Sequence, residues 1–469
     1  MSGVPCGRSC LPFIHYLLYP FSTGFLSACL RSSNKIWSYL LPSCSNDLFQ
    51  IFRQEQGYLQ KLVSIQVLVS YRFCMIDPYS SQVLQPLHIQ NQSHSNFLLD
   101  QAKKIPSIVI SSAAAANAVM LGGGYFTPLK GFMDHADVLN VSKKMRLTSG
   151  LFWPTPVVNM VREDSLTEEI RSASKIALLD PNVEGHPVIA VQSVDKIETM
   201  TDQQVSEISE QVYGTTDSKH PGVASFLTAG NTLISGDIEV LNYSYFKTEF
   251  SDTFRTAVEI RDEIKKRGWE TVIAFQTRNP MHRAHEELCR IAQKQLSADG
   301  ILVHMLLGKL KEGDIPADIR NASIRKMVEL YFPENTVMVT GYGFDMLYAG
   351  PREALLHAIF RQNAGCSHLI VGRDHAGVGD YYGAFDSQTI FDSIPEETLQ
   401  IEIFRGDHTV WCFKCGEVVM MKDCPHDRED YLLISGTRVR EILSEGKELP
   451  PEFSRPEVAK ILSEYYQNL

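Results

Sequence analysis

The second half of the chain alternates strand-like runs with helical stretches, and this alternation restricts the fold more than any other feature. From about Phe246 onward, short apolar runs are followed by stretches of helical periodicity. The runs lie at 271–275, 301–307, 336–340 and 368–371, and the helical stretches at 282–296, 320–331 and 351–364. This order predicts an α/β fold in which helices wrap a parallel sheet and ligands bind at the carboxyl ends of the strands.

A dense group of polar side chains follows the first of these runs. The segment from Ile273 to Glu286 reads Ile-Ala-Phe-Gln-Thr-Arg-Asn-Pro-Met-His-Arg-Ala-His-Glu, with a turn at Asn279-Pro280 and a helical pattern opening at about Met281. A helix N-terminus offers free N–H groups and the positive end of the helix dipole, so an anion binds there readily. The candidate ligand-binding residues are Gln276, Arg278, Asn279, His282 and His285.

The chemistry of these side chains suits phosphate or another tetrahedral oxyanion. Arg278 offers a planar fork to such a group. His282 and His285 are three residues apart, share a helix face and can donate hydrogen bonds to phosphate oxygens. The histidines could instead be surface residues or metal ligands, but so many anion-binding side chains between a buried strand and a helix favour a phosphate site.

A second loop of similar character follows the run that ends at Val371. Residues 371–383 read Val-Gly-Arg-Asp-His-Ala-Gly-Val-Gly-Asp-Tyr-Tyr-Gly, and Gly372, Gly377 and Gly379 would let a ligand approach the backbone closely. A solvated loop with scattered charge is the alternative. The position at a second strand terminus favours a ligand-binding loop.

Three cysteines and a histidine are clustered near the C-terminus. Cys412, Cys415, Cys424 and His426 give the spacing Cys-x2-Cys-x8-Cys-x-His. Such a set suits a tetrahedral zinc ion that holds a loop together, and buried free cysteines are the alternative. Because a single residue separates Cys424 from His426, the fourth ligand is the one that the sequence leaves open. The lone Cys289 and Cys366, near expected helices, are predicted to lie in the core.

The remaining expected helices have capping signals. Ala349 to Gly365 reads as a helix with Pro351 at its start and Gly365 at its end, and we expect His357 to be a hydrogen-bonded core residue. Ser435 or Thr437 caps the last clear helix.

The net charge, the number of cysteines and the absence of one motif limit the functions that the chain can have. The net charge of −11 argues against binding nucleic acid through bulk electrostatics. Five cysteines remain after Met75, which is no disulfide framework and indicates a reducing, cytoplasmic compartment. No Gly-x4-Gly-Lys-Ser/Thr motif is present, so we expect no fused P-loop kinase.

Residues 1–74 differ from the rest of the chain. They hold six Lys/Arg, two Asp/Glu and five of the ten cysteines. We interpret them as a poorly ordered leader or a spurious upstream extension, with Met75 as the working start, and organellar targeting as the alternative. The apolar stretch from Leu11 to Leu30 is interrupted by His15, Tyr16 and Pro20, so we expect no membrane span.

The two polar loops identify a family. Residues 276–285 resemble the Gln-x-Arg-Asn-Pro-x-His-x-x-His signature of the ATP sulfurylases (sulfate adenylyltransferases), and residues 372–377 resemble their Gly-Arg-Asp-His-Ala-Gly motif, both without a departure. The resemblance runs from about Asp77 to the C-terminus and includes a glycine-rich turn, 122–132, and the segment 146–154. No expected strand precedes this turn and no Lys-Ser/Thr pair follows it, so we interpret the turn as structural rather than phosphate-binding.

The resemblance implies a domain organisation. A PUA-like mixed β domain would occupy 75–245, with short strands such as Phe152 to Val161 and Pro187 to Val191. A Rossmann-like nucleotidyltransferase domain would follow at 246–405. A C-terminal zinc-knuckle and helical region would occupy 406–469.

The resemblance also implies an activity, the reversible conversion of ATP and sulfate to adenosine 5′-phosphosulfate and pyrophosphate by direct in-line attack. Sulfate would bind to Gln276, Arg278 and the backbone N–H of Ala376. The catalytic residues would be Arg278, Asn279, His282 and His285. Mg²⁺ would accompany ATP, a structural Zn²⁺ would bind the cysteines, and the chain would form a homo-oligomer without nucleic acid or membrane. The nucleotide would contact Gln276, Thr277, Asn279, His282, His285, Gly372, Arg373, Asp374 and His375.

Two further points stay open at this stage. Related nucleotidyltransferases place a Ser-x-Thr-x-x-Arg turn against the triphosphate, which would give Thr437 and Arg440 a phosphate role, although capping alone explains the hydroxyls. The alternatives to sulfate adenylylation are an adenylyltransferase for a different acceptor and a non-catalytic, zinc-stabilised homologue that binds RNA or protein.

Overall fold

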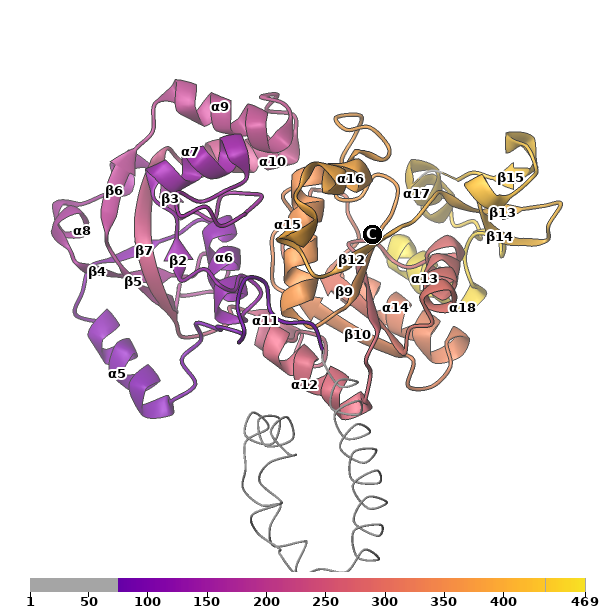
Figure 1. Cartoon of the computed structure of the whole chain (residues 1–469), viewed down its shortest axis with the longest axis horizontal. Helices are drawn as coiled ribbons and strands as arrows, with labels where there is room; N and C mark the ends of the chain where they lie inside the picture. Colours follow the sequence, from indigo (N-terminus) through magenta and orange to yellow (C-terminus); the bar gives the residue numbers. More distant parts are fainter. Residues whose placement is uncertain (1–74, 435, 469) are drawn as a thin grey trace, which may run out of the picture. The chain divides into compact units, whose positions relative to one another are not determined.

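The computed structural model describes residues 75–434 and 436–468 (Figure 1). The predictions about residues 1–74 and about Ser435 as a helix cap fall outside the described residues. Among the described residues, no helix is both long enough and apolar enough to cross a lipid bilayer.

The first part of the described chain builds a seven-stranded mixed sheet. Its order is β1-β4-β5-β7-β2, and β3 and β6 also pair with the long strand β7. Only the β1–β4 pair is parallel. The strands are β1 (Ser107–Val109), β2 (Gly131–Phe132), β3 (Met160–Val161), β4 (Lys175–Leu179), β5 (Val188–Ser193), β6 (Lys196–Thr199) and β7 (Thr232–Val240). The helices are α5 (Gln92–Ala102), α6 (Ser112–Gly122), α7 (His135–Lys144), α8 (Glu168–Ser172), α9 (Asp202–Tyr213) and α10 (Pro221–Thr228).

The expected strand from Phe152 to Val161 is wrong in its extent. Phe152 makes only an isolated bridge to Arg146, and the regular strand is the two-residue β3. Pro154 and Pro156 lie between them and have no N–H to donate to a ladder. The strand expected at Pro187 to Val191 is present as β5.

The second part forms the predicted parallel sheet. Its five strands run in the order β10-β9-β8-β11-β12, and all pairs are parallel. The fifth strand, β12, was not predicted. The strands are β8 (Val272–Thr277), β9 (Gly300–Leu306), β10 (Val337–Tyr342), β11 (His368–Val371) and β12 (Glu402–Arg405). The helices are α11 (Phe246–Glu249), α12 (Ala257–Arg267), α13 (Arg283–Leu296), α14 (Ala317–Tyr331), α15 (Pro351–Asn363) and α16 (Asp386–Thr389).

The last part adds a small sheet and two helices. The antiparallel strands β13 (Thr409–Cys412), β14 (Glu417–Met420) and β15 (Tyr431–Leu432) pair in the order β14-β13-β15. The helices α17 (Gly436–Ser444) and α18 (Pro456–Gln467) follow, and α18 packs on α14. Leu443, Leu449 and Leu462 form the apolar contact there, so the C-terminus is tied to the parallel sheet through α14.

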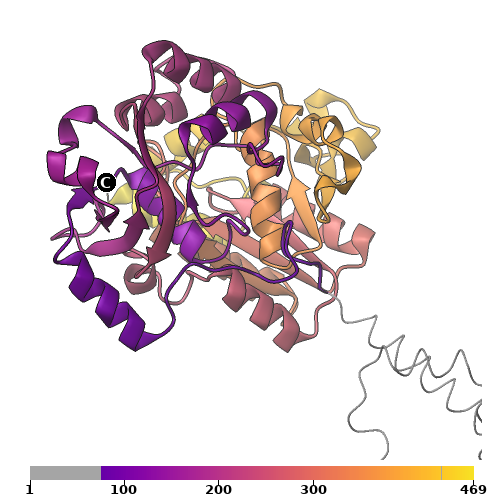
Figure 2. The same cartoon turned by 60° about the vertical axis from the view of Figure 1, so that its left-hand side comes forward.

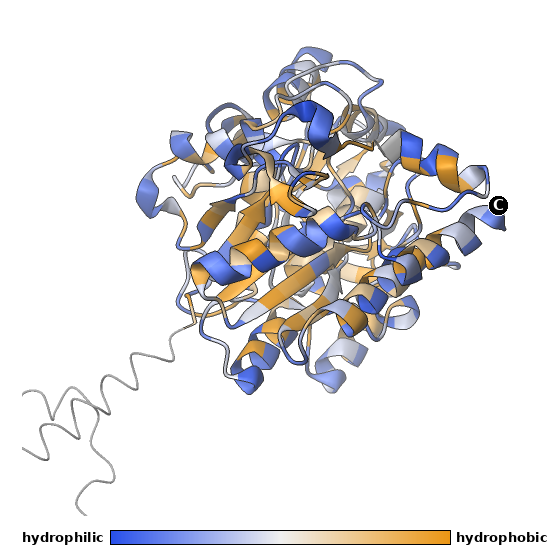
Figure 3. Cartoon of the chain, turned by 90° about the vertical axis from the view of Figure 1, so that its right-hand side faces the viewer, coloured by the Kyte–Doolittle hydropathy of each residue, from blue (hydrophilic) through white to orange (hydrophobic). Residues whose placement is uncertain are grey.

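Helix α15 is the most deeply placed helix of the described chain. Every residue from Glu353 to Asn363 is buried. Turning the molecule shows α15 between the mixed sheet and the parallel sheet (Figure 2). Apolar residues gather on the strands and on the inner sides of the helices, whereas the outer helix faces are hydrophilic (Figure 3). The core is therefore continuous from one sheet to the other.

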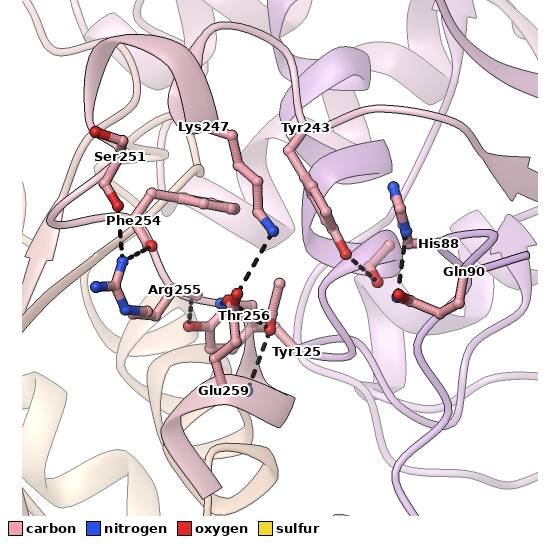
Figure 4. Close-up of polar contacts among 11 residues, drawn as sticks. His88, Gln90, Tyr125, Tyr243, Lys247, Ser251, Phe254, Arg255, Thr256 and Glu259 are labelled. Atoms are coloured by element: carbon pink, nitrogen blue, oxygen red, sulfur yellow. Dashed lines mark hydrogen bonds and ion pairs between the residues drawn. The ribbon is translucent and has the colours of Figure 1, made fainter. Parts of the chain in front are cut away.

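Polar contacts also join the two sheets at the start of α12 (Figure 4). Tyr125 Oη donates to Arg255 O at 2.6 Å, and Lys247 Nζ donates to Glu259 Oε1 at 3.4 Å. Glu259 also forms a capping box with Thr256, which fixes where α12 begins. This junction holds the glycine-rich turn before Tyr125 in place, which agrees with a structural role for that turn.

Candidate active site

Strands β8 and β11 are parallel neighbours in the sheet, and the order in which strands are added along the sequence reverses between them. From β8 the sheet grows to one side through β9 and β10, and to the other side through β11 and β12. Open α/β sheets bind ligands at this switch point, outside the carboxyl ends of the strands. A cavity of about 640 Å³ lies there, and it is lined by both polar loops.

Arg278, just beyond β8, has one half of its guanidinium engaged. Nη2 donates to Gly377 O at 2.9 Å, and the guanidinium carbon lies 5.0 Å from the centre of the Tyr348 ring. Nη1 is buried and has no hydrogen-bond partner among the described residues. A buried cationic N–H without a partner is costly, so this atom is suited to receive an anionic oxygen.

The residues on either side of Arg278 shape the same turn. Gln276 Nε2 donates to Tyr342 Oη at 3.3 Å. Thr277 Oγ1 accepts from Asn279 N at 3.0 Å and donates to Asn279 O at 2.8 Å. Thr277 therefore closes the turn that carries Arg278, and all four side chains line the cavity.

His282 and His285 lie against each other at the start of α13. The helix begins at Arg283, two residues later than expected, and His282 is its N-cap. The two ring centres are 3.9 Å apart, and the His282 ring also stacks on Phe453 at 4.8 Å. Nδ1 of each histidine is buried and has no partner within the described chain. Two ring nitrogens are thus available to a ligand in the cavity.

Burial keeps both histidines neutral near pH 7. Burial lowers the pKa of His285 to about 4. Burial, then the neighbouring His285 and His408, lower the pKa of His282 well below its ordinary value. A neutral imidazole donates one hydrogen bond and accepts another.

The start of α13 has fewer free N–H groups than expected. Arg283 N donates to Phe453 O at 3.0 Å, whereas Ala284 N makes no hydrogen bond to another described residue. His282 makes no side-chain cap bond, and Ala284 lines the cavity. The helix terminus therefore still faces a ligand, through one N–H group rather than several.

The loop after β11 has an unusual backbone. Asp374 and Ala376 are in the left-handed region, with φ of 53° and 58°. A Cβ at Gly377 would lie 2.0 Å from Asp374 Oδ1, so any larger residue there would displace the Asp374 side chain. Ala376 O accepts from Gly350 N at 3.1 Å, and Ala376 N has no partner within residues 75–434 and 436–468. This strained backbone therefore carries an N–H without a partner, at a residue that lines the cavity.

The other residues of this loop also line the cavity. A Cβ at Gly372 would meet nothing within 4 Å, so the backbone there is open to a ligand. His375 Nε2 lies 3.0 Å from His357 Nδ1, which confirms His357 as a hydrogen-bonded core residue. Burial raises the pKa of Asp374, and the nearby Arg278 and Arg373 partly offset that rise.

A third wall of the cavity was not found from the sequence. It includes Asp407 and His408 after β12, Trp411 on β13, Arg428, and Phe453 before α18. Asp407 and His408 follow a parallel strand as the two motifs do, so recognising β12 would have identified them. Trp411 and Phe453 carry no local signal, because tertiary packing alone brings them here.

The proposed phosphate turn at the start of α17 follows Ile434, which lines the cavity. Arg440 is in α17 and approaches the loop before α14, where its Nη1 would lie 3.8 Å from a Cβ at Gly313. Arg440 does not line the cavity. The Thr437 side chain lies outside the described residues.

The cysteine and histidine cluster comes together as predicted. Sγ of Cys415 and Cys424 are 3.7 Å apart, and His426 Nδ1 lies 3.3, 3.3 and 3.5 Å from Sγ of Cys412, Cys415 and Cys424. A zinc tetrahedron with bonds of about 2.3 Å to sulfur and about 2.0 Å to nitrogen has edges of about 3.8 and 3.5 Å. The four side chains therefore fit one tetrahedral ion, and His426 belongs to the set.

Cys289 and Cys366 are fully buried, as predicted. Burial raises the pKa of Cys289 well above its ordinary value and that of Cys366 to about 12. Both are therefore unreactive core residues.

Comparison with known proteins identifies the family and the fold. The ATP-sulfurylase family model matches residues 251–465, and a PUA-like domain model matches residues 76–243. A solved structure described as a hexameric APS kinase from Thiobacillus denitrificans has a similar fold, with a TM-score of 0.64 at 23% identity over 83% of this chain and 69% of that one.

Two curated relatives are much more similar in sequence. A sulfate adenylyltransferase from Alcanivorax borkumensis is 62% identical over 397 residues, which cover 84% of this chain and 98% of the relative. One from Allochromatium vinosum is 59% identical over 397 residues, 84% of this chain and 99% of the relative. With its two motifs, its parallel sheet and this degree of identity, the chain belongs to the ATP-sulfurylase family.

Proposed function

We propose that this protein is a sulfate adenylyltransferase, which joins sulfate to the α-phosphorus of ATP and releases pyrophosphate. One observation carries the proposal: unpartnered hydrogen-bonding atoms of Arg278, Ala376, His282 and His285 converge on a single cavity at the switch point of the sheet. Relatives up to 62% identical carry this name.

Sulfate is a poor nucleophile, and the phosphate chain repels it, so the site has to position and neutralise the reactants rather than activate one with a base. Arg278 Nη1, Ala376 N and the Gln276 amide hold sulfate oxygens. One sulfate oxygen then attacks the α-phosphorus in line, a new S–O–P bridge forms, and the bond to the pyrophosphate oxygen breaks.

The nucleotide occupies the rest of the cavity. Asn279, His282 and His285 contact the phosphates, and the two neutral histidines donate to oxygens on which charge develops. Mg²⁺ bound to ATP would neutralise part of the leaving pyrophosphate. The remaining nucleotide contacts are Thr277, Gly372, Arg373, Asp374 and His375. Thr437 and Arg440 remain proposed triphosphate contacts, although Arg440 is not among the residues that line the cavity.

The cysteine and histidine cluster is proposed to hold a structural zinc ion. Zinc would join β13, β14 and the segment before β15. Thr409, Val410 and Trp411 on β13 and Val418 on β14 line the cavity. The ion would therefore stabilise a wall of the active site without taking part in the reaction.

We also propose the domain division at about residues 245 and 405, a cytoplasmic location and a homo-oligomeric state. The division is supported by the three sheets, which use separate stretches of chain. Light scattering of the purified protein tests the oligomeric state.

The central experiment measures pyrophosphate release from ATP with and without sulfate. We expect release to require sulfate and to persist when molybdate, a tetrahedral dianion, replaces it. Folded protein that releases pyrophosphate without regard to sulfate, or only with an organic acceptor, would instead be an adenylyltransferase of another specificity. Folded protein that releases none with any acceptor would be a non-catalytic homologue.

A further inference from the structure

One face of the buried helix α15 is polar. Glu353, His357 and Arg361 are spaced by four residues, so they share a face, and each is 0% exposed. Buried ionisable side chains reduce stability unless hydrogen bonds or opposite charges compensate them. None of the three lines the cavity, and none has a role in the reaction described above.

Glu353 fixes the backbone on both sides of Tyr348. Oε1 accepts from Leu347 N and Oε2 accepts from Ala349 N, both at 3.1 Å. The Tyr348 ring between these anchors is the surface on which Arg278 rests, at 5.0 Å. The next residue, Gly350, donates to Ala376 O. One carboxylate thus holds the segment that touches both Arg278 and Ala376.

His357 reaches the second loop directly. Its Nδ1 lies 3.0 Å from Nε2 of His375, and both rings are buried. His375 immediately precedes Ala376, whose N–H is unpartnered. The His357 ring therefore restrains the orientation of this N–H group.

Arg361 reaches Gln276 through one intervening ring. Its guanidinium carbon lies 4.7 Å from the centre of the Tyr342 ring, and Tyr342 Oη accepts from Gln276 Nε2 at 3.3 Å. Nη1 of Arg361 donates to His357 O at 3.4 Å, whereas Nε and Nη2 have no hydrogen-bond partner among the described residues. No ion pair joins Arg361 to a carboxylate of the described chain, and Glu353 lies next to His357 instead. A buried cation without a counter-ion adds a favourable field for a dianion nearby.

We propose that Glu353, His357 and Arg361 are positioning residues for the bound oxyanion. Each acts through one intermediary on a different element of the sulfate site: Tyr348 for Arg278, His375 for the Ala376 N–H, and Tyr342 for Gln276. This inference rests on the proposed function, since it assigns Glu353 and Arg361 to the sulfate half of the site, whereas His357 acts through His375, which is also a proposed nucleotide contact.

Arg361→Met gives the sharpest test, because a structural role and a positioning role predict different results. Methionine is unbranched and fills much of the same space. A buried charge without a counter-ion costs desolvation free energy that no ion pair offsets, so an apolar side chain in its place removes that cost. We expect the melting temperature to stay the same or to rise, the KM for sulfate to increase about tenfold, and the KM for ATP to change less than about twofold.

Glu353→Gln provides a second variant with nearly unchanged shape. The amide keeps one acceptor oxygen but places an NH2 group against one of the two backbone donors. The KM for sulfate should again rise about tenfold, with a smaller change in the KM for ATP. Gln192→Leu is the matched control: Gln192 is a buried polar residue of β5 that bonds Asn159 and Ile234, so its loss should lower stability and leave the ratio of the two KM values unchanged.

Calorimetric titration of sulfate into the protein saturated with a non-hydrolysable ATP analogue separates this inference from the proposed function. Sulfate binding that is about tenfold weaker in Arg361→Met supports the inference even if turnover fails. Unchanged sulfate affinity, equal increases in both KM values, or a fall in melting temperature with unchanged kinetics would overturn it. Wild-type protein that binds the analogue but no sulfate would refute both.

Discussion

Arg278 and Gly377 join the ends of two strands across 99 residues of sequence, since Arg278 Nη2 donates to Gly377 O at 2.9 Å. This bond uses one nitrogen of the guanidinium and leaves the other, Nη1, buried without a partner. The same side chain therefore braces the two loops and presents a donor to the cavity.

Arg278→Ala should abolish sulfate-dependent turnover. Loss of a charge-assisted donor to the dianion is expected to lower kcat/KM for sulfate by about a thousandfold. The bond to Gly377 is a single, partly buried hydrogen bond, so the melting temperature should stay within about 2 °C of wild type. Steady-state kinetics and thermal unfolding check both expectations.

Arg278→Lys is the companion variant, since it keeps the charge and loses the fork. It should recover only a small part of the activity. If Arg278→Ala instead loses ATP binding and its fold together, Arg278 serves the structure and not the substrate.

Two glycines of the loop after β11 should respond differently to alanine. A Cβ at Gly377 would meet Asp374 Oδ1 at 2.0 Å, whereas a Cβ at Gly372 would meet nothing within 4 Å. Gly377→Ala should therefore displace the Asp374 side chain and disturb the carbonyl to which Arg278 donates, which should weaken sulfate binding. Gly372→Ala should keep the wild-type melting temperature and raise only the KM for ATP, since the methyl group projects into the nucleotide cavity. Equal effects of the two changes would contradict this assignment.

The parallel sheet could be predicted because each of its first four strands contains a mostly apolar run. The runs at β8, β9, β10 and β11 are bounded by helical periodicity, which fixes both their type and their order. Strand β12 was missed because only Ile403 and Phe404 are apolar between Glu402 and Arg405. Its pairing with β11, a tertiary contact, decides its conformation.

The site residues could be predicted from the sequence where several of them lie together in one short segment. Residues 276–285 and 372–377 end neighbouring strands, so their meeting followed from the topology. Tyr348 and Phe453 had no such signal. Tyr348 follows β10 by six residues and meets Arg278 only because Glu353 holds its backbone, and Phe453 arrives from the C-terminal segment.

Arg455→Ala should destabilise the cover over the start of α13. Arg455 Nε and Nη2 donate to the two oxygens of Glu286 at 2.9 and 2.8 Å, and Glu286 is 2% exposed. Removing one partner leaves a buried carboxylate that, among the described residues, only Arg290 still compensates, at 3.2 Å. The free energy of unfolding should fall by about 2 kcal/mol, measured by denaturant titration.

The KM for ATP should also rise in this variant, because the segment with Phe453 covers His282. Lys447→Ala, which removes an exposed pair with Glu445, is the control and should leave the unfolding midpoint unchanged. A similar midpoint for both variants would show that the Arg455 pair contributes little.

Cys412→Ser should remove the metal and loosen one wall of the cavity. Elemental analysis of wild-type protein should give about one zinc ion per chain, and the variant should contain little. Limited proteolysis should then cut between residues 406 and 432, and the KM for ATP should rise. Cys289→Ser, at a buried cysteine outside the cluster, should keep its zinc. Less than half an equivalent of zinc in gently purified wild type would reject the metal site.

The low pKa values of His282 and His285 should make the folding stability depend on pH, and His285 allows a direct test. Its pKa is about 4 in the folded protein, below the value near 6.5 of an unfolded chain. Between these values the unfolded state binds more protons than the folded state, so this residue's contribution to stability is lost as the pH falls from about 6.5 toward 4. The loss between pH 6.5 and 5 is up to about 2 kcal/mol.

Glu353 acts in the opposite direction, since burial raises its pKa to about 7. The test is therefore a difference: His285→Gln should lose less stability than wild type over this range in denaturant titrations, whereas the exposed His94→Gln should behave as wild type. Parallel curves for wild type and His285→Gln would show that His285 is not held neutral by burial.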